Sequence, residues 1–189
     1  AFTLPEEVKL VCREDRLENL LAELALHSLD VLISDSPVPP GGSVRAFSHL
    51  LGETPVSFFG SPELVRAYKA GFPGSLEGAP MVLPLENSAP RRLLTQWMTR
   101  HGIRPKVVAE FEDSALLKVF GAEGAGVFMA PTVVEKEVCK QYGVGVLGRA
   151  PELRERFYAI SVERRLKHPA VVALTDAARQ DLFVGKRRR

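Results

Sequence analysis

Short apolar segments typical of β-strands alternate with amphipathic helical segments along this 189-residue chain, and this alternation restricts its fold more than any other feature. Four leucines between positions 17 and 24 recur at helical spacing and predict a helix over about 16–27. The segment 30–34 that follows is typical of a strand buried on both faces of a parallel sheet. This order indicates an α/β protein with mostly parallel sheets. Further strands are predicted over 8–12, 47–51, 55–59, 81–85, 107–111, 126–130 and 157–162.

Residues with clear local roles mark the ends of the predicted helices. Ser61, Ser88 and Asp113 precede helical segments, and their side chains accept hydrogen bonds from the first free amides of a helix. Gly102 ends the helix that Ser88 begins, because glycine readily takes the left-handed conformation found after a helix. The closing helix begins at His168-Pro169.

Composition and charge indicate a globular protein without a strong attraction for nucleic acid. Hydrophobic residues make up 46% of the chain, and 25 basic residues face 23 acidic ones, for a net charge of +2. Basic residues are concentrated only in the last four positions, 186–189, which we interpret as a solvated tail. No apolar run approaches the roughly 20 residues that span a bilayer, and the first residues lack an export signal. We therefore expect a soluble cytoplasmic protein.

Motifs for catalysis or for a bound cofactor are not supported. The segment 143–148 matches GxGxxG, but Arg149-Ala150-Pro151 follows it where a dinucleotide site needs the start of a helix. Four histidines occur in unrelated contexts, without HExxH spacing, and no serine lies in a GxSxG motif. Cys12 and Cys139 are too few and too far apart for a disulfide framework or a cysteine-rich zinc site. We expect a protein that is not an enzyme and has no cofactor.

Polar clusters follow three predicted strands, at 34–36, 86–88 and 112–114. In open α/β sheets, ligands bind beyond the carboxyl ends of strands and at helix N-termini, so these clusters predict a binding cleft. Asp, Asn and Ser are also good helix caps, and each cluster has this purely structural explanation. The candidate effector-binding residues are Ser34, Asp35, Ser36, Asn87, Ser88, Asp113, Ser114 and Met129.

The order of elements and several segments resemble the effector-binding domain of LysR-type transcriptional regulators. The segment 29–33 resembles the family's Leu-Asp-aliphatic strand, and 115–131 resembles its helix–glycine–strand–proline signature. His168-Pro169-Ala170-Val171 resembles the return into the last helix. Within the family, the similarity is closest to a sodium-responsive activator of a sodium/proton antiporter gene. The segments that carry this closer similarity are 29–37, 52–59, 110–131 and 158–171.

The resemblance implies a two-lobed fold like that of type 2 periplasmic binding proteins, with each lobe a mostly parallel sheet flanked by helices. Lobe I would comprise 1–56 plus 157–189 and lobe II 57–156, joined by two hinge strands. By this resemblance, we expect the family's N-terminal helix-turn-helix domain, and the first strand and helix of lobe I, to be missing from this chain. We therefore expect DNA binding through a missing N-terminal domain, and not through this chain.

The resemblance also implies an effector and a partner. The effector would be sodium, with a response coupled to pH, and Asp35 and Asp113 are the candidate ligands because hard cations prefer oxygen. The partner would be a second copy of the chain, in a dimer or tetramer. Two other classes remain open: a solute-binding protein of a transport system and a small enzyme of similar fold. The sequence upstream of Ala1 would distinguish a regulator from a solute-binding protein, because the first has a helix-turn-helix there and the second an export signal. Turnover assays would distinguish a regulator from an enzyme.

Overall fold

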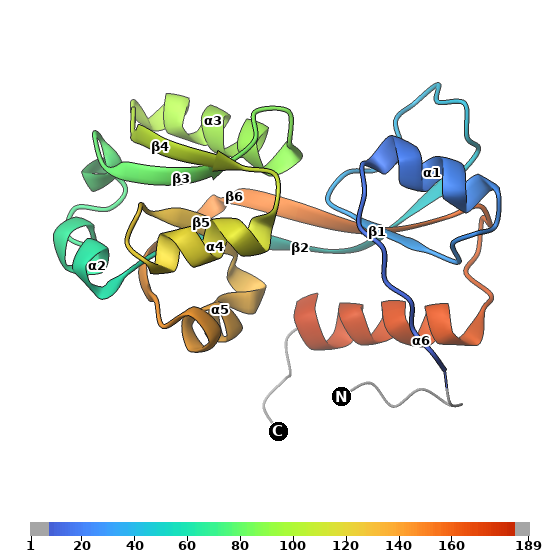
Figure 1. The fold of residues 1–189 in the computed structure, drawn as a ribbon. Coiled ribbons are helices and arrows are strands. Elements are labelled where there is room, and N and C mark those ends of the chain that lie inside the picture. Colours follow the sequence, from blue (N-terminus) through green and yellow to red (C-terminus); the bar gives the residue numbers. More distant parts are fainter. Residues whose placement is uncertain (1–7, 184–189) are drawn as a thin grey trace. The chain divides into compact units, whose positions relative to one another are not determined.

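The computed structural model describes residues 8–183, and the chain forms two compact units (Figure 1). One unit contains the chain up to Glu53 and again from Arg156 onward, and the other contains Thr54–Glu155. Two long strands, β2 (Phe47–Gly60) and β6 (Gly145–Ser161), contribute residues to both units. We call the first unit 1 and the second unit 2.

Unit 1 is built around α1 (Leu17–Ala25) and the short strand β1 (Leu32–Ser34). β1 pairs antiparallel with the end of β6, and Leu32 lies opposite Ile160. The leucines of α1 pack on this pair, so their helical spacing becomes one buried face. The unit ends with α6 (Pro169–Ala177) and a π-helical turn, η3 (Ala178–Phe183).

Unit 2 contains the parallel strands β3 (Pro80–Pro84) and β4 (Lys106–Phe111), and also β5 (Phe128–Pro131), which pairs antiparallel with β2. A single parallel bridge joins Met81 of β3 to Val127, just before β5. The helical elements of the unit are α2 (Pro62–Tyr68), η1 (Gly74–Leu76), α3 (Ala89–His101), α4 (Ser114–Ala122), η2 (Thr132–Val134) and α5 (Glu135–Tyr142).

Alternation along β3 divides the core of unit 2 into two clusters. Met81 and Leu83 pack in one cluster with Trp97 of α3, whereas Val82 packs in the other with Leu117 of α4. Successive side chains of a strand point to opposite faces, so α3 and α4 cover opposite faces of the β3–β4 sheet (Figure 1). The segment 81–83 of this short apolar run is therefore buried on both sides, which explains why it shows no polar alternation.

The expected α/β class is confirmed, although several segments differ from the sequence-based predictions. The segment 8–12 forms no strand, and its Leu10 and Val11 are exposed. The predicted strands 47–51 and 55–59 are one strand, β2, which continues through Pro55. The predicted strand 157–162 is the end of β6, which starts twelve residues earlier, at Gly145. Both long strands pair antiparallel with a neighbour, whereas β3 and β4 pair parallel, so the structure combines the two kinds of pairing where mostly parallel sheets were predicted.

The prediction that 30–34 is a strand buried on both faces of a parallel sheet is wrong, because β1 pairs antiparallel with β6 and Ile33 is 52% exposed. The predicted helix ends are confirmed. Ser61, Ser88 and Asp113 each accept a hydrogen bond as the N-cap of a helix, and Gly102 takes the left-handed conformation after α3. The GxGxxG match runs into β6 and not into a helix, which confirms that it is not a dinucleotide fingerprint. Among residues 8–183, no helix is both long and apolar enough to cross a membrane.

Candidate functional site

The carboxyl ends of three strands of unit 2 share one edge. β3 and β4 run parallel, and the Met81–Val127 bridge gives the start of β5 the same direction. The segments that leave these strands are 85–88, 112–114 and 131–134, and each leads into a helical element. Ligands of α/β sheets bind at this kind of edge, where helix N-termini offer free amides.

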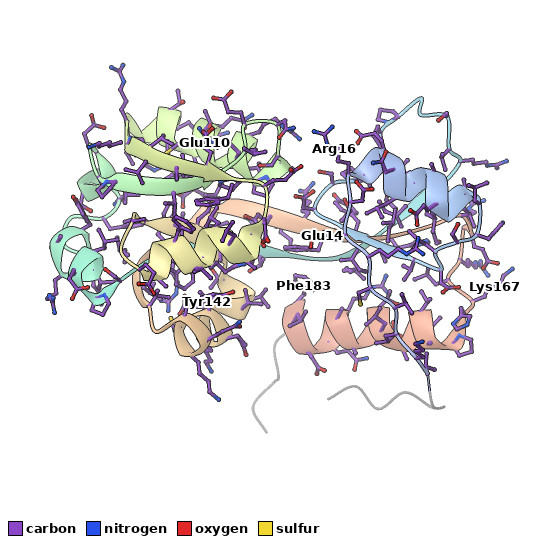
Figure 2. All side chains as sticks on the ribbon, viewed as in Figure 1. Glu14, Arg16, Glu110, Tyr142, Lys167 and Phe183 are labelled. Atoms are coloured by element: carbon purple, nitrogen blue, oxygen red, sulfur yellow. The ribbon has the colours of Figure 1, made fainter. Side chains whose placement is uncertain are left out.

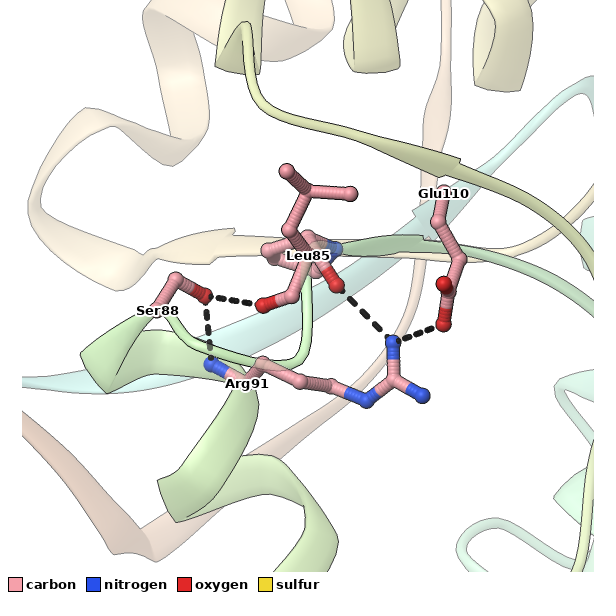
Figure 3. Close-up of polar contacts among 5 residues, drawn as sticks. Leu85, Ser88, Arg91 and Glu110 are labelled. Carbon is pink, nitrogen blue, oxygen red and sulfur yellow. Dashed lines mark hydrogen bonds and ion pairs between the residues drawn. The ribbon is translucent and has the colours of Figure 1, made fainter.

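Asn87 and Ser88 form the turn between β3 and α3 on this edge. The Ser88 hydroxyl donates to the carbonyl of Leu85 at 2.8 Å and accepts from the amide of Arg91 at 3.3 Å (Figure 3). The Asn87 carbonyl accepts from Nη1 of Arg92 at 2.6 Å. The side chain of Ser88 is thus used to cap the helix, and Asn87 is exposed.

Asp113 and Ser114 begin α4 on the same edge, and both are exposed. Oδ1 of Asp113 accepts from the amides of Ala115 and Leu116 at 2.6 and 3.2 Å, which leaves the second carboxylate oxygen, Oδ2, outside these cap bonds. The Ser114 hydroxyl accepts from Nζ of Lys118 at 3.3 Å. Burial lowers the pKa of Lys118, while the carboxylate of Asp113 acts in the opposite direction.

The predicted residues 34–36 lie in unit 1, where they form a local turn. The Ser34 hydroxyl accepts from the amide of Ser36 at 3.1 Å, and the Ser36 hydroxyl donates to Oδ1 of Asp35 at 3.0 Å. Met129 belongs to the core of unit 2, where it is 8% exposed and lies opposite Phe58 in the β2–β5 ladder. The structure therefore brings together Asn87, Ser88, Asp113 and Ser114 on one edge. It places Met129 in a packed interior. Within residues 8–183, no three His, Cys, Asp or Glu side chains are grouped so that they could hold a metal ion.

A buried arginine at this edge was missed by the sequence analysis. Nη1 of Arg91 donates to the carbonyl of Pro84 at 2.8 Å and to Oε1 of Glu110 at 2.7 Å (Figure 3). Arg91 is only 9% exposed and lies in the first turn of α3, while Glu110 projects from β4 (Figure 2). A basic residue in the first turn of a helix opposes the helix dipole. This unfavourable position was the one feature of the sequence that could have indicated a special role for Arg91.

A second polar network joins Ser57 of β2 to three residues that are distant from it in sequence. The hydroxyl of Ser57, which is fully buried in β2, lies 2.8 Å from Oγ1 of Thr132 and 2.8 Å from Oε2 of Glu135. Glu135 also accepts from Nε and Nη2 of Arg149, at 2.8 and 2.6 Å. These contacts span 75 and 78 residues between the strand and its partners, so no local pattern could reveal them.

A model of the LysR substrate-binding domain matches residues 4–182. The chain belongs to the LysR substrate-binding domain family. It is 34% identical over 181 residues to the transcriptional activator protein NhaR of Escherichia coli, and the match covers 94% of this chain. The chain spans 58% of the length of that NhaR.

Solved structures with a similar fold are also LysR regulators. The regulatory domain of HypT from Salmonella typhimurium aligns with a TM-score of 0.60 at 18% identity, covering 85% of this chain and 76% of the other. DarR of Vibrio fischeri, solved in complex with DNA, aligns with a TM-score of 0.63 at 17% identity, covering 88% of this chain and 56% of the other. At such identities the similarity concerns the fold, and it confirms the α/β fold of LysR regulatory domains. The family assignment confirms that the chain is an effector-binding domain of the LysR type.

Proposed function

We propose that this LysR-type effector-binding domain is the sensing part of a longer transcriptional activator that responds to sodium and pH. The 34% identity to NhaR across 94% of the chain is the observation that carries the proposal. The relatives found are transcriptional regulators, and none is an enzyme by its description. DNA contact belongs to a domain outside this chain, and the setting is the cytoplasm, where an operator is accessible.

In this proposal, units 1 and 2 are lobes I and II of the domain, and β2 and β6 are its hinge strands. An effector changes such a protein only through its difference in affinity for two conformations. The two strands are shared by both units, so a change in their conformation is the route from a bound effector to the rest of the regulator.

Sodium would bind through oxygen atoms, as hard cations do. The candidate ligands with charge are Asp35 in unit 1 and Asp113 at the carboxyl edge of unit 2. Asp113 is the better placed of the two, because its Oδ1 is held by two backbone amides and its carboxylate is thereby oriented. Neighbouring hydroxyls and carbonyls of the edge supply further oxygens.

Sodium binding can be tested by the thermal unfolding midpoint of this chain. Sodium chloride would be exchanged for potassium or choline chloride at constant ionic strength, so that general screening is unchanged. We expect a rise in the midpoint that is specific for sodium. This rise should shrink in Asp113→Asn, which keeps the helix cap and removes the charge. Equal midpoints in all three salts would reject sodium as the effector.

The proposed partner is a second copy of the chain, and an apolar surface on unit 2 suits that role. Leu116, Val119 and Phe120 of α4 and Val107 and Val108 of β4 are each 41–46% exposed. The Phe120 ring contacts Phe111 of β4, with centroids 4.9 Å apart, so α4 and the end of β4 adjoin at these two rings. Exposed apolar surfaces of this kind mark protein contacts.

Sedimentation of the chain tests this contact. Phe120→Glu should convert a dimer to a monomer, because a carboxylate buried without a partner is strongly unfavourable. Leu26→Glu is the matched control, since Leu26 is 77% exposed and lies on unit 1. If Phe120→Glu still sediments as a dimer, this surface is not the contact between the two copies.

A further inference from the structure

A buried hydroxyl in unit 2 connects an ion pair to the carboxyl edge. Ser57 is fully buried, and its Oγ lies 2.8 Å from both Oε2 of Glu135 and Oγ1 of Thr132. Glu135 begins α5 and Thr132 begins η2, directly after β5 ends at Pro131. The three residues form a chain of hydrogen bonds from the α5 terminus to the edge of the sheet.

The direction of these hydrogen bonds follows from the chemistry of the groups. An ionised carboxylate can only accept, and a serine hydroxyl has a single proton to donate. Ser57 must therefore donate to Glu135, which leaves only its lone pairs for Thr132. The Thr132 hydroxyl in turn donates to Ser57, and its own proton is used.

Arg149 keeps Glu135 ionised, and this fixes the direction of the hydrogen bonds. It donates to both oxygens of Glu135, through Nε at 2.8 Å and Nη2 at 2.6 Å. The hydrogen bonds from Arg149 lower the pKa of Glu135, with a further contribution from Ser57, so the carboxylate stays ionised at neutral pH. A bidentate Arg–carboxylate pair also fixes the orientation of the carboxylate.

Thr132 lies at the carboxyl edge of unit 2, directly after β5. It is partly exposed, and the parallel bridge between Met81 and Val127 places the strand before it on the same edge as the segments of Ser88 and Asp113. Among residues 8–183, its hydroxyl has Ser57 as its hydrogen-bond partner and accepts from no group.

We propose that Thr132 is a specificity-determining residue whose hydroxyl is held as a pure acceptor, so that the ligand at this edge is a cation or a hydrogen-bond donor. Ser57, Glu135 and Arg149 are positioning residues that act through it. An anion at the same place would find no hydrogen-bond donor in the Thr132 hydroxyl. The inference rests on the proposed function for the existence of an effector site, and it adds the chemical class of the effector.

The test measures the thermal midpoint of the chain against three probes at constant ionic strength. The probes are sodium chloride and methylammonium chloride, each compared with choline chloride, and choline acetate as the anion. Thr132→Val removes the hydroxyl with little change of shape, and Thr132→Ser keeps it. Ser57→Ala leaves the Thr132 hydroxyl free to turn its proton outward.

We expect the cations to stabilise the wild type and Thr132→Ser alike. The apparent affinity should be about fivefold weaker in Thr132→Val, as for the loss of one ligand contact of about 1 kcal/mol. Ser57→Ala should lose part of the cation response and gain a response to acetate. Such a gain would not follow if Ser57 only filled space.

Three outcomes separate the two proposals. Equal sodium responses in the wild type and Thr132→Val would overturn the role of Thr132 and leave sodium sensing intact. If methylammonium stabilises the wild type through Thr132 and sodium has no effect, the acceptor role of Thr132 is supported and sodium is rejected as the effector. If acetate stabilises the wild type but not Thr132→Val, the Thr132 hydroxyl donates to the ligand, and its proposed role as an acceptor is wrong.

Discussion

Nη1 of Arg91 lies 2.7 Å from Oε1 of Glu110, and this ion pair joins the first turn of α3 to the end of β4. The Arg91 side chain is 10% exposed and that of Glu110 is 35% exposed, so the arginine is the more desolvated partner. The same Nη1 atom also holds the carbonyl of Pro84 at the end of β3. One guanidinium thus ties both parallel strands to α3, the helix that connects them.

Arg91→Met should lower the free energy of unfolding by about 2 kcal/mol, because it leaves the Pro84 carbonyl and a half-buried carboxylate without their donor. Glu110→Gln should cost less, since the amide oxygen can still accept. Urea unfolding measures the stability of each variant. The double variant should lose less stability than the sum of the losses in the two single variants. Strict additivity would mean that the two side chains do not interact.

Gly121→Ala in α4 should be destabilising, because an added Cβ would lie 2.2 Å from Cδ1 of Phe128. That ring is fully buried and stacks on Phe59 with centroids 5.4 Å apart, so it cannot move away freely. We expect a loss of about 2 kcal/mol in urea unfolding, as for other overpacked cores. Gly74→Ala is the control, since nothing lies within 4 Å of its added Cβ, and it should be neutral.

Much of the fold could be predicted from local signals, and the errors have a common cause. Capping residues such as Ser88 and Asp113 act within three residues of their own position, so the sequence shows their role directly. β2 was predicted as two short strands because Pro55 resembles a break. Only the end of β6 was predicted, because the stretch before Phe157 is polar. Pairing with neighbouring strands holds these segments extended, and pairing is not visible in one sequence.

The candidate site was predictable only in part, for the same reason. The segments 86–88 and 112–114 were recognised because polar residues follow apolar strands, and the parallel β3–β4 pair places them on one edge. The Ser57 network depends on contacts across at least 75 residues, which no spacing rule can anticipate. Met129 was included as a site residue, yet its strand position points it into the core. The effector-binding role of the polar residues stays a prediction.

Trp97, the only tryptophan of the chain, should report the protonation of Glu152. The indole Nε1 donates to Oε1 of Glu152, and this bond is the main reason why the pKa of Glu152 lies below its ordinary value of 4.5. A lowered folded-state pKa means that the stabilisation is complete above pH 4.5 and is lost as the pH falls through the folded value. Trp97 is 2% exposed, so its fluorescence should change in that acid range before the chain unfolds. Glu152→Gln should remove this titration, and an unchanged profile would contradict the assignment.

Asp113 can be tested separately as a helix cap and as a charge. Asp113→Ala removes the acceptor of the Ala115 and Leu116 amides and should cost about 1 kcal/mol in urea unfolding. Asp113→Asn keeps an acceptor oxygen at the N-cap, so its loss should be a few tenths of a kcal/mol, mainly from the helix dipole. If both variants lose the same stability, the charge and not the cap bond stabilises α4. With the cap retained, any further loss of sodium response in Asp113→Asn comes from the missing charge, because the fold of α4 is unchanged.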